Sequence, residues 1–360
     1  MENKVNSSNP SDDETFCFNI FHRVSRSFAF VTEVLEEPLR TTVSIFYLIL
    51  RGLDTIEDDL IEETMKAKAI ESFTTIFNER PSRPDVCQLR FRPECNQSYV
   101  ELMENFDKVL NVFFSRCTSD AKKIIRDIVN EMAGGMIKYS AQSIDTLKDY
   151  NEYCYYVAGL VGIGLTNLFH LNGEFRMEEM CRARLKHLAI STGSFLQKVN
   201  ILRDIYEDLN QPSGRSFYPA EVWKNYVKSA RDLIDENYRV EAIACLNYLI
   251  NDAFQHLPDS IEYMSRVTDK GIFRFIAIPQ CIAVATLEKM FNNPAVFSSN
   301  VKIGRTEKEN IFENVVDMKS CLSVIGSCLD TFSTRLDFVT GSCSKNWIFE
   351  SVNFVSNYKI

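Results

Sequence analysis

The chain has 360 residues and a net charge of −9, from 49 acidic and 40 basic side chains, and no run of Lys and Arg carries interleaved aromatic residues. Because nucleic acid demands a basic surface for its phosphates, we expect no nucleic-acid partner. A hydrophobic content of 45% excludes a disordered chain, and 11 cysteines scattered singly are typical of reduced thiols in a cytosol-facing protein.

The spacing of the apolar residues predicts a single all-α domain. Apolar positions recur every three or four residues, Gly and Pro are few, and alternating strand patterns are absent. We expect a mobile tail over residues 1–13, and loops over 80–98 and 292–308 that do not separate domains. The predicted helices cover about 39–60, 64–79, 99–115, 119–141, 148–170, 176–209, 219–230, 238–256, 259–267, 271–291 and 309–335.

No segment is predicted to span a membrane. The longest uncharged stretch, 153–170, contains Tyr, Thr, Asn and His and is short for a bilayer crossing. We therefore interpret it as a buried helix.

The first candidate site is the short polar segment Ser25-Arg26-Ser27-Phe28. It precedes an apolar run, so one interpretation is a helix N-cap with a surface arginine. The other is a phosphate-binding fork, because arginine binds phosphate oxygens through two parallel hydrogen bonds. The sequence leaves both interpretations open.

An acidic motif occurs twice, as Asp54-Thr55-Ile56-Glu57-Asp58 and as Asp204-Ile205-Tyr206-Glu207-Asp208, each following an arginine, Arg51 or Arg203. On a helix turning about 100° per residue, its first, fourth and fifth positions share one face, so three carboxylates project together. Such a cluster is costly to desolvate, and hard oxygen ligands suit Mg²⁺. One copy alone is typical of a solvated helix face, but the duplication predicts two opposed faces that grip a metal-bridged diphosphate.

Two further segments are candidates for an apolar ligand channel. The segment 155–164 places three glycines in a helical pattern, either for close helix packing or for a trough that holds a long apolar ligand, and we favour the trough. The segment 271–280 places aromatic residues around a helix that Pro279 kinks. Its default interpretation is ordinary core, and the alternative is an aromatic wall beside a cationic intermediate.

Taken together, these segments resemble squalene synthase, the farnesyl-diphosphate farnesyltransferase of the all-α trans-prenyltransferase group in the squalene/phytoene synthase family. The resemblance spans nearly the whole chain in the family's order. It rests on Ser25-Arg26-Ser27-Phe28-Ala29 and on the segments 50–59, 156–162, 197–204, 214–219 and 277–280.

The resemblance implies an isoprenoid synthase fold with a central active-site channel and a two-step reaction. Two farnesyl diphosphates condense to presqualene diphosphate, which rearranges and takes hydride from NADPH to give squalene for sterol biosynthesis. It also implies a catalytic domain over 14–335 and a C-terminal segment over 336–360 that leads to a membrane anchor absent from this sequence. We expect Mg²⁺, with Mn²⁺ as a substitute, and a monomer on the cytosolic face of the endoplasmic reticulum membrane.

The resemblance further assigns roles to individual residues. The implied metal ligands are Asp54, Glu57, Asp58, Asp204, Glu207 and Asp208. The implied diphosphate-binding residues are Ser25, Arg26, Arg51, Gln197, Asn200 and Arg203, and the implied NADPH contacts are Arg26, Arg51, Arg203, Lys302 and Arg305. Beside the aspartates, the implied catalytic residues are Tyr156, Phe273 and Phe275.

Departures and alternatives accompany this prediction. The family's Lys-Ile-Arg-type run reads Lys302-Ile303-Gly304-Arg305 here, so Lys302 is better supported than Arg305 as a dinucleotide contact. The alternative within the enzymes is a phytoene- or dehydrosqualene-type synthase that omits the reduction. The alternative of another class is a non-catalytic helical scaffold that binds metal or prenyl lipids.

Overall fold

The computed structural model describes residues 11–25, 27–78, 85–171, 181–211, 214–335 and 346–358. Its regular elements are helices, as predicted, and the described residues include an isolated β-bridge between Leu60 and Phe91. Contacts divide the chain into two compact units, Met1–Ile137 and Lys138–Ile360.

Unit 1 is built around one apolar helix, α3. The elements of this unit are α1 (Asp12–Ser25), α2 (Ser27–Thr32), α3 (Leu39–Asp59), α4 (Lys66–Thr75), α5 (Gln97–Glu104), α6 (Phe106–Arg116) and α7 (Ser119–Ser140), whose last three residues belong to unit 2. Helix α3 contacts α1, α2, α4, α5 and α6. At Gly52 the rings of Phe73 and Phe106 pack so closely that a Cβ atom would lie 2.8 Å from the Phe106 ring. The glycine thus lets α4 and α6 close onto α3.

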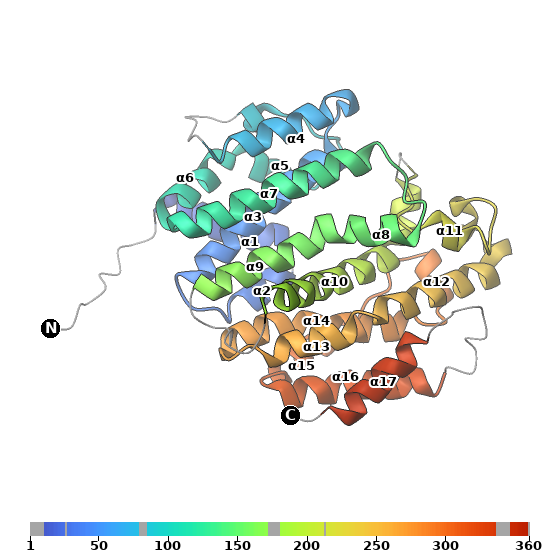
Figure 1. The fold of residues 1–360 in the computed structure, drawn as a ribbon. Coiled ribbons are helices and arrows are strands. Elements are labelled where there is room, and N and C mark those ends of the chain that lie inside the picture. Colours follow the sequence, from blue (N-terminus) through green and yellow to red (C-terminus); the bar gives the residue numbers. More distant parts are fainter. Residues whose placement is uncertain are drawn as a thin grey trace. The chain divides into compact units, whose positions relative to one another are not determined.

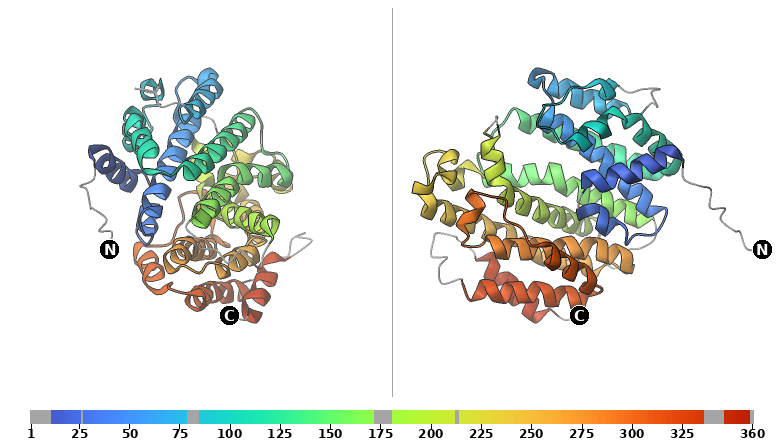
Figure 2. Two further views of the ribbon diagram at one scale, coloured as in Figure 1. Left: turned by 60° about the vertical axis from the view of Figure 1, so that its left-hand side comes forward. Right: turned by 180° about the vertical axis from the view of Figure 1, so that it is seen from behind.

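Unit 2 is built around the long helix α10 (Figure 1). Its elements are α8 (Leu147–Cys154), a π-helical turn (Tyr155–Gly159), α9 (Leu160–Leu171), α10 (Arg182–Asn210), α11 (Ala220–Trp223), α12 (Arg239–Phe254), α13 (Leu257–Ser265), α14 (Lys270–Met290), α15 (Arg305–Asn314), α16 (Met318–Ser333) and α17 (Trp347–Asn357). Helix α10 contacts α8, α9, α12, α13 and α14. Helix α14 also packs against α16, and α16 against α17 (Figure 2).

The glycines of the segment 155–164 serve close helix packing. A Cβ atom at Gly162 would lie 2.2 Å from the carbonyl oxygen of Ala189, and one at Gly159 would lie 3.1 Å from Ile190. On α10, a Cβ at Gly193 would lie 2.3 Å from the carbonyl oxygen of Ala158. The predicted trough is therefore wrong at Gly159 and Gly162, where α10 fills the space. The π-helical turn marks a local break of the regular hydrogen-bond ladder here.

Several predicted boundaries differ from the observed ones. Helix α1 begins at Asp12, inside the predicted tail, and α17 lies inside the C-terminal segment, where it buries Ile348. The predicted helix 99–115 is broken at Asn105, which ends α5 and precedes α6. The predicted helix 219–230 is one α-helical turn, α11. These differences arise at caps and short turns, where periodicity carries little information.

Two helical stretches are long and apolar enough to cross a membrane by length and composition alone. In Lys270–Met290, 72% of the apolar window is buried, as in a core helix of a soluble protein. In Leu147–Leu171 only 39% of the apolar window is buried. This stretch is therefore less buried than we predicted for the helix over 153–170. Length and composition thus leave this second stretch as a weak candidate.

The cysteines within the described residues are all free thiols. Eight of these ten are buried, whereas Cys181 is exposed and Cys328 is intermediate. The predicted pattern of single, mostly buried thiols is confirmed for this part of the chain.

Candidate functional site

The first acidic segment occupies the last two turns of α3, the central helix of unit 1. Asp58 is exposed in the last turn, and Asp54, one turn earlier, is 28% exposed. The C-terminal end of a helix carries partial negative charge, so a carboxylate there lowers stability, and α3 has no basic residue in its last turn. The arrangement is unfavourable for folding and favours a cationic ligand.

Arg51 links the first acidic segment to aromatic residues. Its Nη1 lies 3.5 Å from Oδ2 of Asp54, and its Nη2 donates to the hydroxyl of Tyr47 at 3.3 Å. The guanidinium also lies 5.0 Å from the centre of the Tyr99 ring. Its Nε–H is buried and has no hydrogen-bond partner within the described residues. A buried cationic donor with one free hydrogen suits a phosphate oxygen.

Protonation of the first acidic segment is shifted toward the neutral form. The pKa of Asp58 is raised to about 7, because the surrounding protein desolvates this carboxyl although part of its surface stays open to solvent, and because the charges of Asp54 and Asp59 also favour its neutral form. Burial also raises the pKa of Asp54, although Arg51 opposes the shift. Crowded carboxylates of this kind are stabilised in their charged form by a nearby cation. Glu57 is only 7% exposed, so its side chain does not share the exposure of Asp58.

The second acidic segment occupies the last two turns of α10, which also has no basic residue in its last turn. Arg203 makes two parallel hydrogen bonds to Asp204, from Nε to Oδ1 at 2.7 Å and from Nη2 to Oδ2 at 2.6 Å. The pKa of Arg203 is raised above its usual value. Burial alone would lower it, but the hydrogen bond to Asp204 and the charges of Asp204, Glu207 and Asp208 outweigh that effect. All three predicted carboxylates of this segment therefore lie near one arginine.

Asn300 joins this segment from the loop before α15. Its Nδ2 donates to Oδ1 of Asp204 at 2.8 Å and to Oε1 of Glu207 at 3.3 Å. Its own Oδ1 is buried and accepts no hydrogen bond within the described residues. Asn300 thus holds the Asp204 and Glu207 carboxylates side by side, and carboxylate oxygens are ligands that Mg²⁺ prefers.

A basic group lies next to the second acidic segment. Burial lowers the pKa of Lys308, and the positive charges of Lys302 and Arg203 also lower it, so both cations are near enough to Lys308 to repel it. Arg305 is different, because its side chain is 91% exposed and its Nε donates to Glu309 at 2.7 Å. Sequence reasoning missed Lys308 because it placed residues 292–308 in a loop, whereas α15 begins at Arg305 and brings Lys308 onto its first turn.

The predicted polar residues near the N-terminus of α2 and along α10 are placed as follows. The Oγ of buried Ser25 accepts a hydrogen bond from the backbone N–H of Ala29 at 3.0 Å, which supports the capping interpretation for this residue. Arg26 lies outside the described residues. Gln197 is half-buried and Asn200 is exposed.

The predicted aromatic residues lie in two places within unit 2. Tyr156 is half-buried in the π-helical turn, with its ring 5.3 Å from Tyr155 and 6.3 Å from Tyr139. Phe273 and Phe275 are buried on α14, and Phe275 packs edge-to-face on Phe169 at 5.8 Å. The buried pair matches the interpretation as ordinary core, and a catalytic role for these residues stays a prediction.

Within the described residues, no group of three or more His, Cys, Asp or Glu side chains is arranged to hold a metal ion by itself. Each acidic segment does supply hard oxygen atoms, unsatisfied polar atoms and a neighbouring arginine. Such residues fit a metal ion that arrives together with a phosphate-bearing ligand, which supplies the remaining oxygen ligands.

An all-helical fold whose two central helices each end in carboxylates beside an arginine defines an all-α isoprenoid synthase. The model of the squalene/phytoene synthase family matches residues 21–307. The chain belongs to this family, which confirms the resemblance found in its sequence.

Several known proteins are similar to this chain over most of its length. Squalene synthase 8 of Panax ginseng is 39% identical over 324 residues, which is 89% of this chain and 78% of that protein. Squalene synthase of Nicotiana benthamiana is 37% identical over 330 residues, 91% of this chain and 75% of that protein.

Solved structures give the same result for the fold. A complex of TcSQS with the ligand E5700 has a TM-score of 0.87 and 34% identity, covering 96% of this chain and 97% of that one. A dehydrosqualene synthase has a TM-score of 0.58 at 19% identity, covering 89% of this chain and 97% of that one, and it supports the fold alone.

Proposed function

We propose that the chain joins two molecules of farnesyl diphosphate and reduces the product to squalene. In the first step a carbon–carbon bond forms between two farnesyl chains, and one diphosphate and one proton leave, which gives presqualene diphosphate. In the second step the other diphosphate leaves, the skeleton rearranges, and hydride from NADPH quenches the cation. The observation that carries this proposal is 37–39% identity with squalene synthases over 89–91% of the chain.

The acidic segments suit the loss of diphosphate. A bound Mg²⁺ or Mn²⁺ would neutralise the charge that develops on the leaving diphosphate. The proposed ligands are Asp54, Glu57, Asp58, Asp204, Glu207 and Asp208. Asn300 orients two of these carboxylates, and we propose it as a positioning residue for the second segment.

The arginines and the basic group suit phosphate binding. Arg51 keeps a buried Nε–H for a diphosphate oxygen, and Arg203 orients Asp204. We propose that Lys302 and Lys308, together with Arg203, bind phosphate groups of NADPH. Arg26, Ser25, Gln197 and Asn200 stay candidates for diphosphate binding on the family resemblance, as does Arg305 for NADPH.

The aromatic residues suit the cationic stages of the reaction. We propose that the half-buried Tyr156 ring faces the allylic cation of the first step. Phe273 and Phe275 would keep water away during the second step, so that hydride quenches the cation instead of hydroxide.

The test of this function is product analysis with purified protein, farnesyl diphosphate, Mg²⁺ and NADPH. Squalene, formed with stoichiometric NADP⁺, is expected. Dehydrosqualene formed despite abundant NADPH would replace this function by that of a phytoene- or dehydrosqualene-type synthase, which shares the acidic segments but omits the reduction.

Substitutions distinguish the enzyme from a non-catalytic scaffold. We expect Asp54→Asn and Asp208→Asn each to lower turnover by about a hundredfold or more, because each weakens stabilisation of the leaving diphosphate. The matched control is Asp127→Asn, an equal charge change at an exposed position of α7. Unchanged turnover in both acidic variants, with the control also unchanged, would favour the scaffold.

The relatives also suggest a location. We propose action at the endoplasmic reticulum membrane, on the cytosolic face, with farnesyl diphosphate and NADPH drawn from the cytosol. Fractionation of the full-length protein from its own cells tests this, since recovery outside the membrane fraction would contradict it.

A further inference from the structure

A separate cavity lies in unit 2, between α9 and the first turns of α10. It has a volume of about 460 Å³, within the range of roughly 300–1,000 Å³ that small-molecule sites occupy. Its floor is apolar and is formed by Ile163, Leu185 and Ala189. None of the residues assigned to the proposed reaction lines it.

The cavity exists because of the way α9 and α10 pack. The two helices are in close contact where Gly162 meets the carbonyl oxygen of Ala189. One turn further along α9, the hydroxyl of Thr166 is satisfied by the carbonyl oxygen of Gly162 at 2.7 Å and by the hydroxyl of Tyr263 at 2.6 Å. These two hydrogen bonds hold the Thr166 side chain in one orientation, where it lines the cavity between the two helices.

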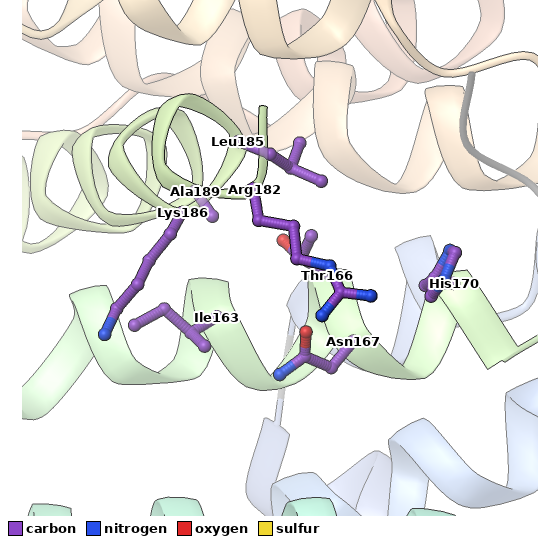
Figure 3. Close-up of a pocket in the computed structure, with 8 residues that line it drawn as sticks. All are labelled: Ile163, Thr166, Asn167, His170, Arg182, Leu185, Lys186 and Ala189. Carbon is purple, nitrogen blue, oxygen red and sulfur yellow. The ribbon is translucent and has the colours of Figure 1, made fainter. Parts of the chain in front are cut away.

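The rim of this cavity is cationic. Arg182 and Lys186 extend from α10 toward α9 (Figure 3). Asn167 points at Arg182, Lys186 reaches toward Ile163, and His170 lies on the other side of Arg182 from Lys186. The four polar side chains are exposed to solvent. Within the part of the chain that the structure describes, Arg182 and Lys186 have no acidic partner.

The neighbouring face of α10 provides the contrast. Arg184 donates to Asp259 at 2.9 Å and also pairs with Glu262, and His187 pairs with Asp259 at 2.9 Å. The same two turns of helix therefore pair Arg184 and His187 with acidic residues of α13, whereas Arg182 and Lys186 have no acidic partner among the described residues. An exposed unpaired cation is ordinary on a surface, but two of them over an apolar cavity form a site for an amphiphilic anion.

We propose that this cavity binds a phosphate-bearing amphiphile, with its phosphate between Arg182 and Lys186 and its hydrocarbon on the apolar floor. Arginine offers parallel donors that match phosphate oxygens, and the Asn167 amide adds a neutral donor. The hydrocarbon part of the ligand would contact the apolar side chains of Ile163, Leu185 and Ala189, which inorganic phosphate would not contact. Two sources share this chemistry, a soluble prenyl phosphate and the headgroup region of an anionic phospholipid. The site does not depend on the proposed reaction.

The test is isothermal titration of the purified protein with geranyl monophosphate, in EDTA so that divalent metal is absent. We expect the double variant Arg182→Gln/Lys186→Gln to bind at least about tenfold more weakly than the unsubstituted protein, since hydrogen bonds to charged groups contribute about 1.5–3 kcal/mol each. The control Lys228→Gln, which removes an exposed lysine elsewhere in unit 2, should change binding by less than about twofold.

A second variant and a second ligand keep the test decisive. Asn167→Asp adds a negative charge at the rim without changing side-chain size and should weaken binding by about tenfold, even if the double variant unfolds. Inorganic phosphate should bind at least about tenfold more weakly than geranyl monophosphate, because it buries no hydrocarbon.

Vesicles identify the source. Co-sedimentation with phosphatidylcholine vesicles containing phosphatidic acid, lost in the double variant, supports the lipid, whereas binding of geranyl monophosphate alone supports the soluble ligand. The proposal is overturned if neither probe binds, if the rim variants bind as the unsubstituted protein does, or if inorganic phosphate binds as tightly as geranyl monophosphate.

Discussion

Lys198 lies in the interior of unit 2 with its Nζ 2.6 Å from Oδ2 of Asp252. The lysine side chain is 0% exposed, and its Nζ also lies 5.2 Å from the centre of the Tyr150 ring. This pair joins α10 to α12 in the stretch that leads into the second acidic segment. A buried lysine needs such a partner, because an isolated buried charge is very costly.

We predict that Lys198→Met destabilises the protein by about 3–5 kcal/mol, because Asp252 is left without its cation. The free energy of unfolding from urea denaturation measures this loss. The double variant Lys198→Met/Asp252→Leu removes both charges and should recover part of the stability. A double variant less stable than Lys198→Met would contradict this account.

His256 makes the stability of the protein depend on pH. Burial lowers the pKa of His256 well below its usual value, and Lys198 and His187 lower it further. The folded protein therefore keeps this imidazole neutral, while the unfolded chain takes up a proton near pH 6.5. Because the unfolded state binds more protons below that pH, the contribution is fully present above pH 6.5 and is lost as the pH falls.

We predict that between pH 7.5 and pH 5.5 the protein loses up to about 1.4 kcal/mol of stability through this one group. Urea denaturation at both pH values measures the difference, and His256→Gln should lose less over the same interval. Equal losses in the two proteins would show that other groups determine the pH dependence.

The two glycines Gly162 and Gly134 should respond in opposite ways to alanine. Alanine at Gly162 places its Cβ on the carbonyl oxygen of Ala189, so we expect a loss of about 1–3 kcal/mol. Alanine at Gly134 meets nothing within 4 Å on the exposed side of α7, so we expect a gain of about 0.5–1 kcal/mol. Thermal denaturation of both variants tests this, and stabilisation by Gly162→Ala would contradict the observed close packing.

Lys308 and Arg305 should differ in their effect on NADPH. We predict that Lys308→Gln raises the KM for NADPH about tenfold, since one charge-assisted hydrogen bond to phosphate contributes about 1.5–3 kcal/mol. Arg305→Gln should have a smaller effect, because this side chain is exposed and paired with Glu309. Steady-state kinetics at saturating farnesyl diphosphate compares the two, and a larger effect of Arg305→Gln would reverse the assignment.

Long apolar helices could be predicted from the sequence. The prediction of 39–60 matches α3, which covers Leu39–Asp59, and 119–141 matches α7, which covers Ser119–Ser140. In such helices burial and periodicity agree, so the pattern determines the element. Helices α1 and α17 were missed, because their polar termini resemble loops until tertiary contacts bury Ile20 and Ile348.

The site could be predicted only where its residues are close in the sequence. Asp204, Glu207 and Asp208 are spaced to share a helix face, and they do lie near Arg203. The amide of Asn300 reaches Asp204 from 96 residues away, and no local pattern indicates such a contact. Gly162 also shows that the sequence does not reveal contacts between distant segments. The sequence led us to predict an open trough beside this glycine, whereas α10 fills the space.

The carboxylates at the ends of α3 and α10 affect the thermal stability of the protein. Both helices end in charges of the sign that their own peptide dipoles disfavour. Asp58→Asn should therefore raise the melting temperature of the ligand-free protein while lowering turnover, the usual trade-off when an active site retains unfavourable charges. The melting temperature of the protein would then depend on the charge of the carboxylates at these two helix ends. A ligand that neutralises this charge should raise the melting temperature above that of the free protein.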